Sequence, residues 1–223
     1  TGLVKEDTKL SFLGFGTMNG KDGKPFKTRE GGVMRLENLI ADIDEEMFTK
    51  IVENRSVRDK DARDTAKIVG LAAIKYGDLS NQATKDYIFD VDRFTSFEGN
   101  TGPYILYTIV RIKSILNRYV EAGGNLEAGE ILPASNSSEK NLMLQLSGFG
   151  SMIESAFEEK APHKICAYIY EVSNAFNSFY HETKILSEEN QAQKESYIRL
   201  LQLTKRVLET SIDLLGFEAP DKM

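Results

Sequence analysis

The stretch Pro103–Gly124, PYILYTIVRIKSILNRYVEAGG, is predicted to form one long helix. Proline suits the first position of a helix, and the pair Gly123–Gly124 suits a helix end. The apolar side chains recur at spacings of 4, 3, 4 and 3, which places them on one face: Ile105, Ile109, Ile112, Leu116 and Tyr119. Such a stripe has to be buried, so this stretch favours a fold built from packed helices.

Three stretches downstream show the same periodicity, over residues 142–157, 165–179 and 197–215. Pro162 separates the first from the second, and Gly216 is predicted to end the third. We therefore expect an antiparallel helical bundle from about residue 100 to 216. Its predicted core residues are Leu142, Leu146, Phe149, Ile153, Phe157, Ile165, Ile169, Val172, Phe176, Phe179, Tyr197, Leu201, Thr204, Leu208, Ile212 and Leu215.

Upstream of the bundle the pattern changes twice. Residues 9–17, KLSFLGFGT, alternate bulky and small side chains and predict a short strand. Helical periodicity begins near residue 33. A second helix follows in this region, and Gly77 is predicted to end it. The predicted fold is mainly α, with a strand-loop remnant of an α/β domain (1–32), a helical connector (33–98) and the bundle (99–223). A single strand cannot make a sheet alone, so the remainder of the first domain is expected to be absent.

Composition excludes several classes of protein. The chain has 223 residues, a net charge of −6 and 41% hydrophobic residues. No apolar run approaches the roughly 20 residues that a bilayer span needs, and no signal peptide is recognisable. The chain starts with Thr1, so we expect it to be cut from a longer one. Charge is uneven: residues 1–120 hold 19 Lys and Arg against 18 Asp and Glu, and the rest hold 9 against 16.

The sequence gives little support for a metal site or for a catalytic nucleophile. One cysteine, Cys166, excludes an internal disulfide and fits a reducing compartment, so we expect a cytoplasmic protein. Its apolar neighbours predict a buried side chain. His163 and His181 are too few for a metal site. Asp86, Asp90 and Asp92 match no calcium loop and are expected to be solvated turn residues.

The loop Gly20–Gly32, GKDGKPFKTREGG, combines glycines with Lys24, Lys27 and Arg29. Cations beside exposed backbone N–H groups are the parts of an anion site, typically for phosphate. An ordinary basic surface turn is the alternative. The spacing fits neither a P-loop nor a dinucleotide-binding loop.

Aromatic side chains with polar neighbours form a second candidate site. Tyr104, Tyr107 and Arg111 recur at i, i+3 and i+7 on one helix, and Asn177 and Tyr180 share another. At the margin of an apolar stripe such rings either pack at the core boundary or stack on bases, with arginine on a phosphate. If Tyr104, Tyr107 and Arg111 are exposed together, RNA binding is favoured; if they are buried, plain packing is.

Several stretches together resemble the arginyl-tRNA synthetase family. FGTMNGKDGKPFKTREGG resembles the second signature loop of class I synthetases in its arginine form, with the K-M-S-K-S consensus loosened. KDYIFDVDRFTSFEGNTGPYILYTIVRIKSIL resembles the entry into the family's helical anticodon-binding domain. NAFNSFYHETKIL and the ending LLGFEAPDKM resemble the end of that domain. The resemblance covers essentially the whole chain.

The resemblance implies two sets of functional residues. A mobile loop would close on the ATP phosphates, with Lys24, Lys27 and Arg29 stabilising the leaving pyrophosphate beside Phe26 and Thr28. The anticodon stem-loop of arginine tRNA would be contacted from the bundle and from the chain end. The implied contacts are Tyr104, Tyr107, Arg111, Asn177, Tyr180 and Met223.

The resemblance also implies what the chain lacks. The first class I signature, H-I-G-H, does not occur in the sequence. We therefore expect ATP, with magnesium on the nucleotide, to be bound only in the whole enzyme with its N-terminal catalytic part. This chain, expected to be monomeric, should be inactive and should carry no metal or cofactor of its own. The alternatives are a helical protein-interaction module without RNA binding, and a self-contained phosphate-transfer enzyme.

Overall fold

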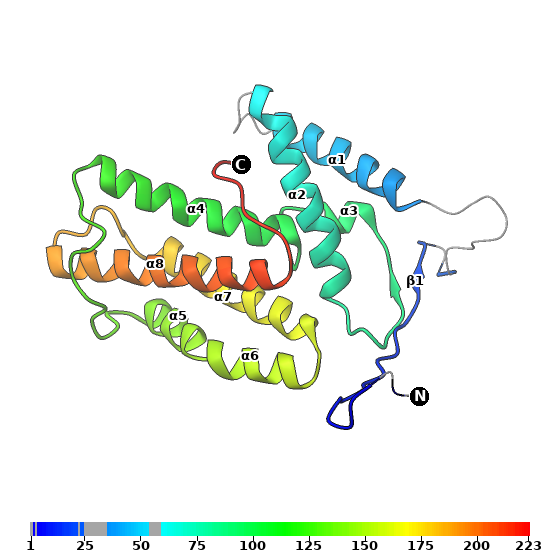
Figure 1. Cartoon of the computed structure of the whole chain (residues 1–223). Helices are drawn as coiled ribbons and strands as arrows, with labels where there is room; N and C mark the ends of the chain where they lie inside the picture. The colour runs from blue at the N-terminus through cyan, green and yellow to red at the C-terminus, as the bar shows by residue number, and fades with distance from the viewer. Residues whose placement is uncertain (1, 3, 22, 25–34, 54–58) are drawn as a thin grey trace.

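The computed structural model describes every residue except 1, 3, 22, 25–34 and 54–58, and it is mainly helical. Helices α4 to α8 form an elongated bundle, beside which α1 and α2 pack as a pair (Figure 1). The elements in chain order are β1 (Met18–Asn19), α1 (Leu36–Glu53), α2 (Asp59–Leu79), β2 (Tyr87–Ile88), α3 (Val91–Phe94), α4 (Gly102–Glu121), α5 (Ser137–Ser147), α6 (Phe149–Glu158), α7 (Pro162–Glu182) and α8 (Gln191–Leu214).

Helix α4 is the central element, as its sequence predicts. It contacts α2, α7 and α8, and its whole apolar stripe from Ile105 to Tyr119 is buried. The Thr101 side chain accepts a hydrogen bond from the Tyr104 N–H and so caps the first turn. Gly123, with φ of 87°, turns the chain after the last turn. The predicted bundle is confirmed. In Figure 1, α4, the consecutive pair α5 and α6, α7 and α8 run in alternating directions, as in an antiparallel bundle.

The helix predicted over residues 142–157 is in fact two helices. Helix α5 ends at Ser147, Gly148 is its C-cap, and α6 begins at Phe149. Glycine stabilises a helix interior poorly, and here the chain restarts its helical bonding with a bond from the Met152 N–H to the Gly148 carbonyl. The break changes which face of α6 is directed toward the core. Phe157 is therefore 82% exposed instead of lying in the core, while Ala156 is buried.

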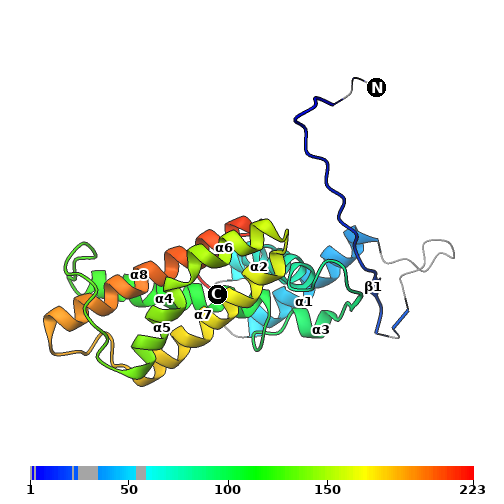
Figure 2. The same ribbon diagram turned by 90° about the horizontal axis from the view of Figure 1, so that it is seen from below.

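The N-terminal part differs more from the expectation. Residues 9–17 form no strand; Phe12 and Phe15 are 94% and 89% exposed. Figure 2 shows this segment leaving the helices. The strand that does form, β1, pairs in parallel with β2, with Met18 opposite Tyr87. The partner strand lies in a polar stretch without alternation, so no local pattern indicated it.

The glycine at position 77 does not end α2, which continues to Leu79. A Cβ atom at this position would lie 2.6 Å from the ring of Phe94 on α3. The absence of a side chain therefore serves close packing rather than helix termination. The proposed limits at 32/33 and 98/99 stay a prediction. Within the described residues no helix is long and apolar enough to cross a membrane.

Tyr76 connects three parts of the fold. Its ring is fully buried, and its hydroxyl lies within hydrogen-bonding reach of Asn100 Oδ1 and, at 2.8 Å, of the Cys166 carbonyl oxygen. Helix α2, the segment before α4 and helix α7 therefore meet at one phenol. Burial raises the pKa of this phenol, so it acts as a neutral donor.

We expect Tyr76→Phe to lower the free energy of unfolding by about 1–3 kcal/mol, because buried acceptors lose their donor. Urea denaturation followed by circular dichroism measures the change. Tyr107→Phe, at an exposed ring, is the control and should leave the midpoint unchanged. Equal midpoints for all three proteins would show that the Tyr76 hydroxyl contributes nothing.

Candidate nucleic-acid interface

The packing of α4 against α7 brings five of the six predicted RNA contacts into one cluster. Arg111 lies at its centre: its guanidinium carbon is 4.7 Å from the centroid of the Tyr107 ring and 5.1 Å from that of Tyr180. Arg111 Nη1 donates to Asn177 Oδ1 at 2.7 Å. Asn177 Nδ2 in turn donates to the Tyr104 hydroxyl at 2.8 Å. We call these five residues the Arg111 cluster.

Burial divides the Arg111 cluster into an inner and an outer part. The Tyr104 hydroxyl donates to Asn174 Oδ1 at 2.8 Å, its ring meets Tyr170 edge-on, and burial raises its pKa. Tyr107 and Tyr180 are 38% and 37% exposed, and Arg111 is half-buried between them. The exposure test gives a divided result: of Tyr104, Tyr107 and Arg111 only Tyr107 is exposed, while Arg111 is half-buried and Tyr104 is hydrogen-bonded inward.

The outer part offers what a single-stranded RNA loop requires. Two tyrosine faces flank a guanidinium, an arrangement that favours stacking of bases and a charge-assisted bond to phosphate. An arginine carries five N–H donors, and the bond to Asn177 engages one of them. Phe176, fully buried, stacks on Tyr180 at 6.0 Å between centroids and fixes that ring from below.

Met223 reaches the bundle by a different route. It is partly buried against the core at the end of the C-terminal segment. This segment is bound by Lys113, whose ammonium donates to the carbonyl oxygens of Ala219 and Pro220 at 3.3 and 3.2 Å. Sequence reasoning missed Lys113, because its partners lie more than a hundred residues away.

The predicted phosphate loop is visible only at its base. Phe26, Lys27, Thr28 and Arg29 lie outside the described residues. The Lys24 carbonyl accepts a hydrogen bond from the Gly20 N–H, which closes a tight turn with Gly23 at φ of 75°. Lys24 is exposed in this turn.

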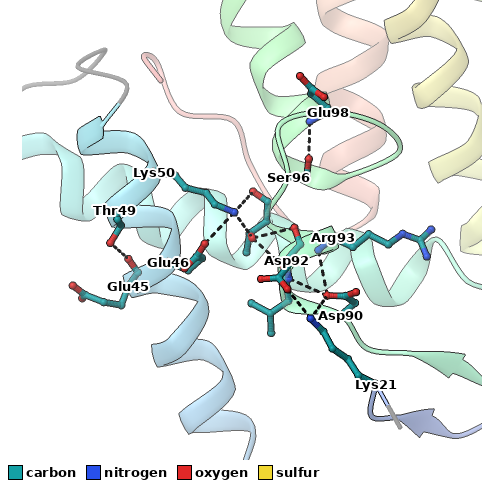
Figure 3. A network of polar contacts seen from close by, with 12 residues as sticks. Lys21, Glu45, Glu46, Thr49, Lys50, Asp90, Asp92, Arg93, Ser96 and Glu98 are labelled. Atoms are coloured by element: carbon teal, nitrogen blue, oxygen red, sulfur yellow. Dashed lines mark hydrogen bonds and ion pairs between the residues drawn. The ribbon is translucent and has the colours of Figure 1, made fainter. Parts of the chain in front are cut away.

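Figure 3 shows how the start of this loop and the helix that follows it are both joined to the segment around α3. At the start of the loop, Lys21 Nζ lies 3.2 Å from Asp90 Oδ1 and 2.6 Å from Asp92 Oδ2. Near the end of α1, Lys50 donates to Thr95 Oγ1 at 2.7 Å and pairs with Glu46 at 3.1 Å. The short segment Asp90–Thr95 therefore contacts both the start of the loop and α1.

The expectation of solvated turn residues holds only in part: Asp86 and Asp92 are exposed, but all three aspartates have partners within the chain. Asp86 accepts the Thr17 N–H at 2.7 Å, and this bond lowers the pKa of its carboxyl group. Asp90 caps α3, and Lys21 lowers the pKa of Asp92. These partners depend on the β1–β2 pairing, which the sequence did not reveal. Among the described residues no three His, Cys, Asp or Glu side chains form a cluster that could hold a metal ion.

Comparisons with known proteins give two family matches. Residues 105–223 match the family described as the DALR anticodon binding domain, and residues 1–91 match the catalytic domain of class I tRNA synthetases of the arginine type. These two matches define the class: class I tRNA synthetases with a DALR anticodon-binding domain. The chain belongs to the arginyl-tRNA synthetase family, as its sequence resemblance indicated.

Individual relatives agree with this placement. The chain is 66% identical to an arginine–tRNA ligase of Agathobacter rectalis and 56% identical to one of Alkaliphilus oremlandii. Both matches cover 100% of this chain but only 39% and 38% of the relatives. The solved arginyl-tRNA synthetase of Thermus thermophilus superposes with a TM-score of 0.83 at 26% identity, over 95% of this chain and 35% of that one.

A nucleophilic role for Cys166 is contradicted by its surroundings. The thiol is buried, and burial raises its pKa to about 12. Since the thiolate is the reactive form, the folded chain should react with iodoacetamide at pH 8 roughly a thousandfold more slowly than the guanidinium-unfolded chain. Mass spectrometry of timed samples measures both rates. Comparable rates would mean that Cys166 is accessible and ionised in the folded protein.

Proposed function

We propose that, within a longer protein, this chain supplies the tRNA-binding part of an arginine–tRNA ligase. The Arg111 cluster contacts the anticodon stem-loop of arginine tRNA. The loop carrying Lys24, Lys27 and Arg29, with Phe26 and Thr28, acts on the phosphates of ATP and its magnesium ion. The complete enzyme joins arginine to the 3′ end of the tRNA in the cytoplasm. The chain itself acts as a monomer and is inactive without the catalytic part.

The observation that carries the RNA assignment is the position of the half-buried Arg111 between the rings of Tyr107 and Tyr180, at the junction of α4 and α7. Each ring keeps more than a third of its surface in solvent, where a base could stack on it. Family membership and the match of residues 105–223 to an anticodon-binding domain support the same assignment. A net charge of −6 is compatible with RNA binding, because affinity depends on local cations.

The assignment of the loop to ATP is supported by family membership and by its flanks. Residues 1–91 match the catalytic domain of arginine-type class I synthetases. Lys21 joins the start of the loop to Asp90 and Asp92 beside α3, so this end of the loop has a defined place. Lys24, Lys27 and Arg29 suit the charge that develops on a leaving pyrophosphate.

Fluorescence anisotropy with a labelled arginine tRNA transcript tests the RNA assignment. We expect saturable binding that weakens about tenfold or more when the anticodon is changed, since each misread base costs about 1–3 kcal/mol. Binding should also weaken as salt is raised from 50 to 200 mM, which reports phosphate contacts. Equal affinity for both transcripts would contradict anticodon recognition. Complete absence of binding at low salt would favour the protein-interaction module.

Substitutions in the outer part of the Arg111 cluster locate the contact. Tyr107→Ala and Tyr180→Ala should each weaken binding roughly 5- to 150-fold, the cost of losing one base–ring stack. Arg111→Lys keeps the charge but loses the planar group between the rings, so its affinity should fall as well. Phe157→Ala removes a more exposed ring on α6 and is the matched control, with unchanged affinity expected. Wild-type affinity in both tyrosine variants would place the RNA elsewhere.

A further inference from the structure

The C-terminal segment turns back over the bundle after α8. Gly216 adopts φ of 80°, and the Phe217 N–H bonds to the Ile212 carbonyl, which reverses the chain. Phe217 and Pro220 are buried. Figure 1 shows the segment rising from the end of α8 across α4. We call residues 219–223 the tail.

Lys113 on α4 is the residue that binds the tail. Its side chain is only 16% exposed. Its ammonium donates to the carbonyl oxygens of Ala219 and Pro220 and lies 3.4 Å from Asp221 Oδ1 and 3.7 Å from Glu209 Oε1. Asp221 is almost fully exposed, so its ion pair adds little. The bonds to the two carbonyls are the contacts that fix the backbone of the tail.

Lys113 and Arg111 emerge on opposite sides of the same helix. Two positions along a helix correspond to about 200° of rotation, so Arg111 faces α7 while Lys113 faces α8 and the tail. Between these two margins α4 presents a solvent-facing strip with the exposed residues Ser114, Asn117 and Arg118. The Arg111 cluster borders this strip on one side, and the tail borders it on the other.

A groove continues the strip on the tail side. It is lined by residues of α4, α8 and the tail, among them Lys205, Arg206 and Lys222. Lys205 pairs with Glu209 at 2.6 Å, so Glu209 is shared between two lysines. The tail supplies one wall of this groove. Pro220 and Met223 pack against the bundle, and the Lys113 ammonium supplies the hydrogen bonds from α4 to the backbone of the tail.

We propose that Lys113 is a positioning residue that holds the tail along α4, so that the tail forms the second wall of the RNA-binding face and presents Met223 to the same RNA. This inference rests on the proposed function. In this proposal Lys113 does not contact the RNA, because its ammonium is bound to carbonyl and carboxylate oxygens of its own chain. Removing it releases the tail and removes Met223 from the face, while the Arg111 cluster stays in place.

Hydrogen–deuterium exchange tests the structural half. Lys113→Met should speed exchange in the peptide covering residues 217–223 and leave the peptides of α7 unchanged. Lys205→Met is the matched control, because it removes the other cation beside Glu209 but has no bond to the tail. Lys113→Arg should restore slow exchange, since a guanidinium can donate to the same carbonyls. Unchanged exchange in Lys113→Met would overturn the proposal.

Anisotropy with arginine tRNA tests the functional half. Lys113→Met should weaken binding about tenfold, the scale expected when an interface segment must be ordered again on binding. Deletion of residues 219–223 should weaken it at least as much, and adding Lys113→Met to the deletion should cause no further loss. The loss of affinity caused by Lys113→Met should be smaller for the transcript with the changed anticodon than for arginine tRNA. The salt dependence of binding should be the same in Lys113→Met as in the unaltered chain. A direct contact of Lys113 with a phosphate would instead weaken binding of both transcripts and reduce the salt dependence.

Two outcomes overturn the proposal, and they distinguish its failure from a failure of the proposed function. If the tail loosens in Lys113→Met but affinity for arginine tRNA stays at the wild-type value, the tail is no part of the RNA-binding face, although the bundle still binds RNA. If the unaltered chain binds no arginine tRNA, the proposed function fails, and a tail that loosens in the variant then shows Lys113 to be a structural clasp alone.

Discussion

The burial of one apolar stripe on α4 is the constraint on which the rest of the structure depends. Ile105, Ile109 and Ile112 are completely buried, and α4 contacts α2, α7 and α8 through this side. Each such side chain contributes about 1.5–3 kcal/mol on burial, so the rotation of α4 about its own axis is strongly fixed. That rotation decides which polar side chains emerge at each margin of the helix, and therefore where any RNA can be contacted.

The two margins of α4 are organised by cations of different kinds. Arg111 extends toward α7, where its planar group lies between two tyrosine rings and bonds to Asn177. Lys113 extends toward α8 and the tail, where carbonyl and carboxylate oxygens surround a compact ammonium. A guanidinium suits stacking and recognition, whereas a lysine surrounded by acceptors suits the fastening of a chain segment. One helix thus carries both the arginine of the proposed RNA contact and a lysine that binds the C-terminal segment.

The N-terminal region is held together differently from the bundle, by contacts between segments that are far apart in the sequence. β1 pairs with β2, Lys21 pairs with Asp90 and Asp92, and Lys50 bonds to Thr95. These contacts join the start of the loop Gly20–Gly32 and the end of α1 to the segment Asp90–Thr95, which precedes α4. The chain spans about 39% of the length of the curated relative that it matches at 66% identity. The exposed Phe12 and Phe15 lie in the part that matches the catalytic domain.

The sequence by itself determined the helices α4, α7 and α8, their apolar faces and the turns at Gly123 and Gly216, because periodicity and capping are local properties of the chain. It also indicated the family. Only the tertiary structure decided that Tyr104 is hydrogen-bonded inward while Tyr107 meets solvent, that Phe157 leaves the core after the break at Gly148, and that the aspartates and Lys113 have partners. Each of these depends on contacts between residues far apart in the chain, and no local pattern encodes how two distant segments meet.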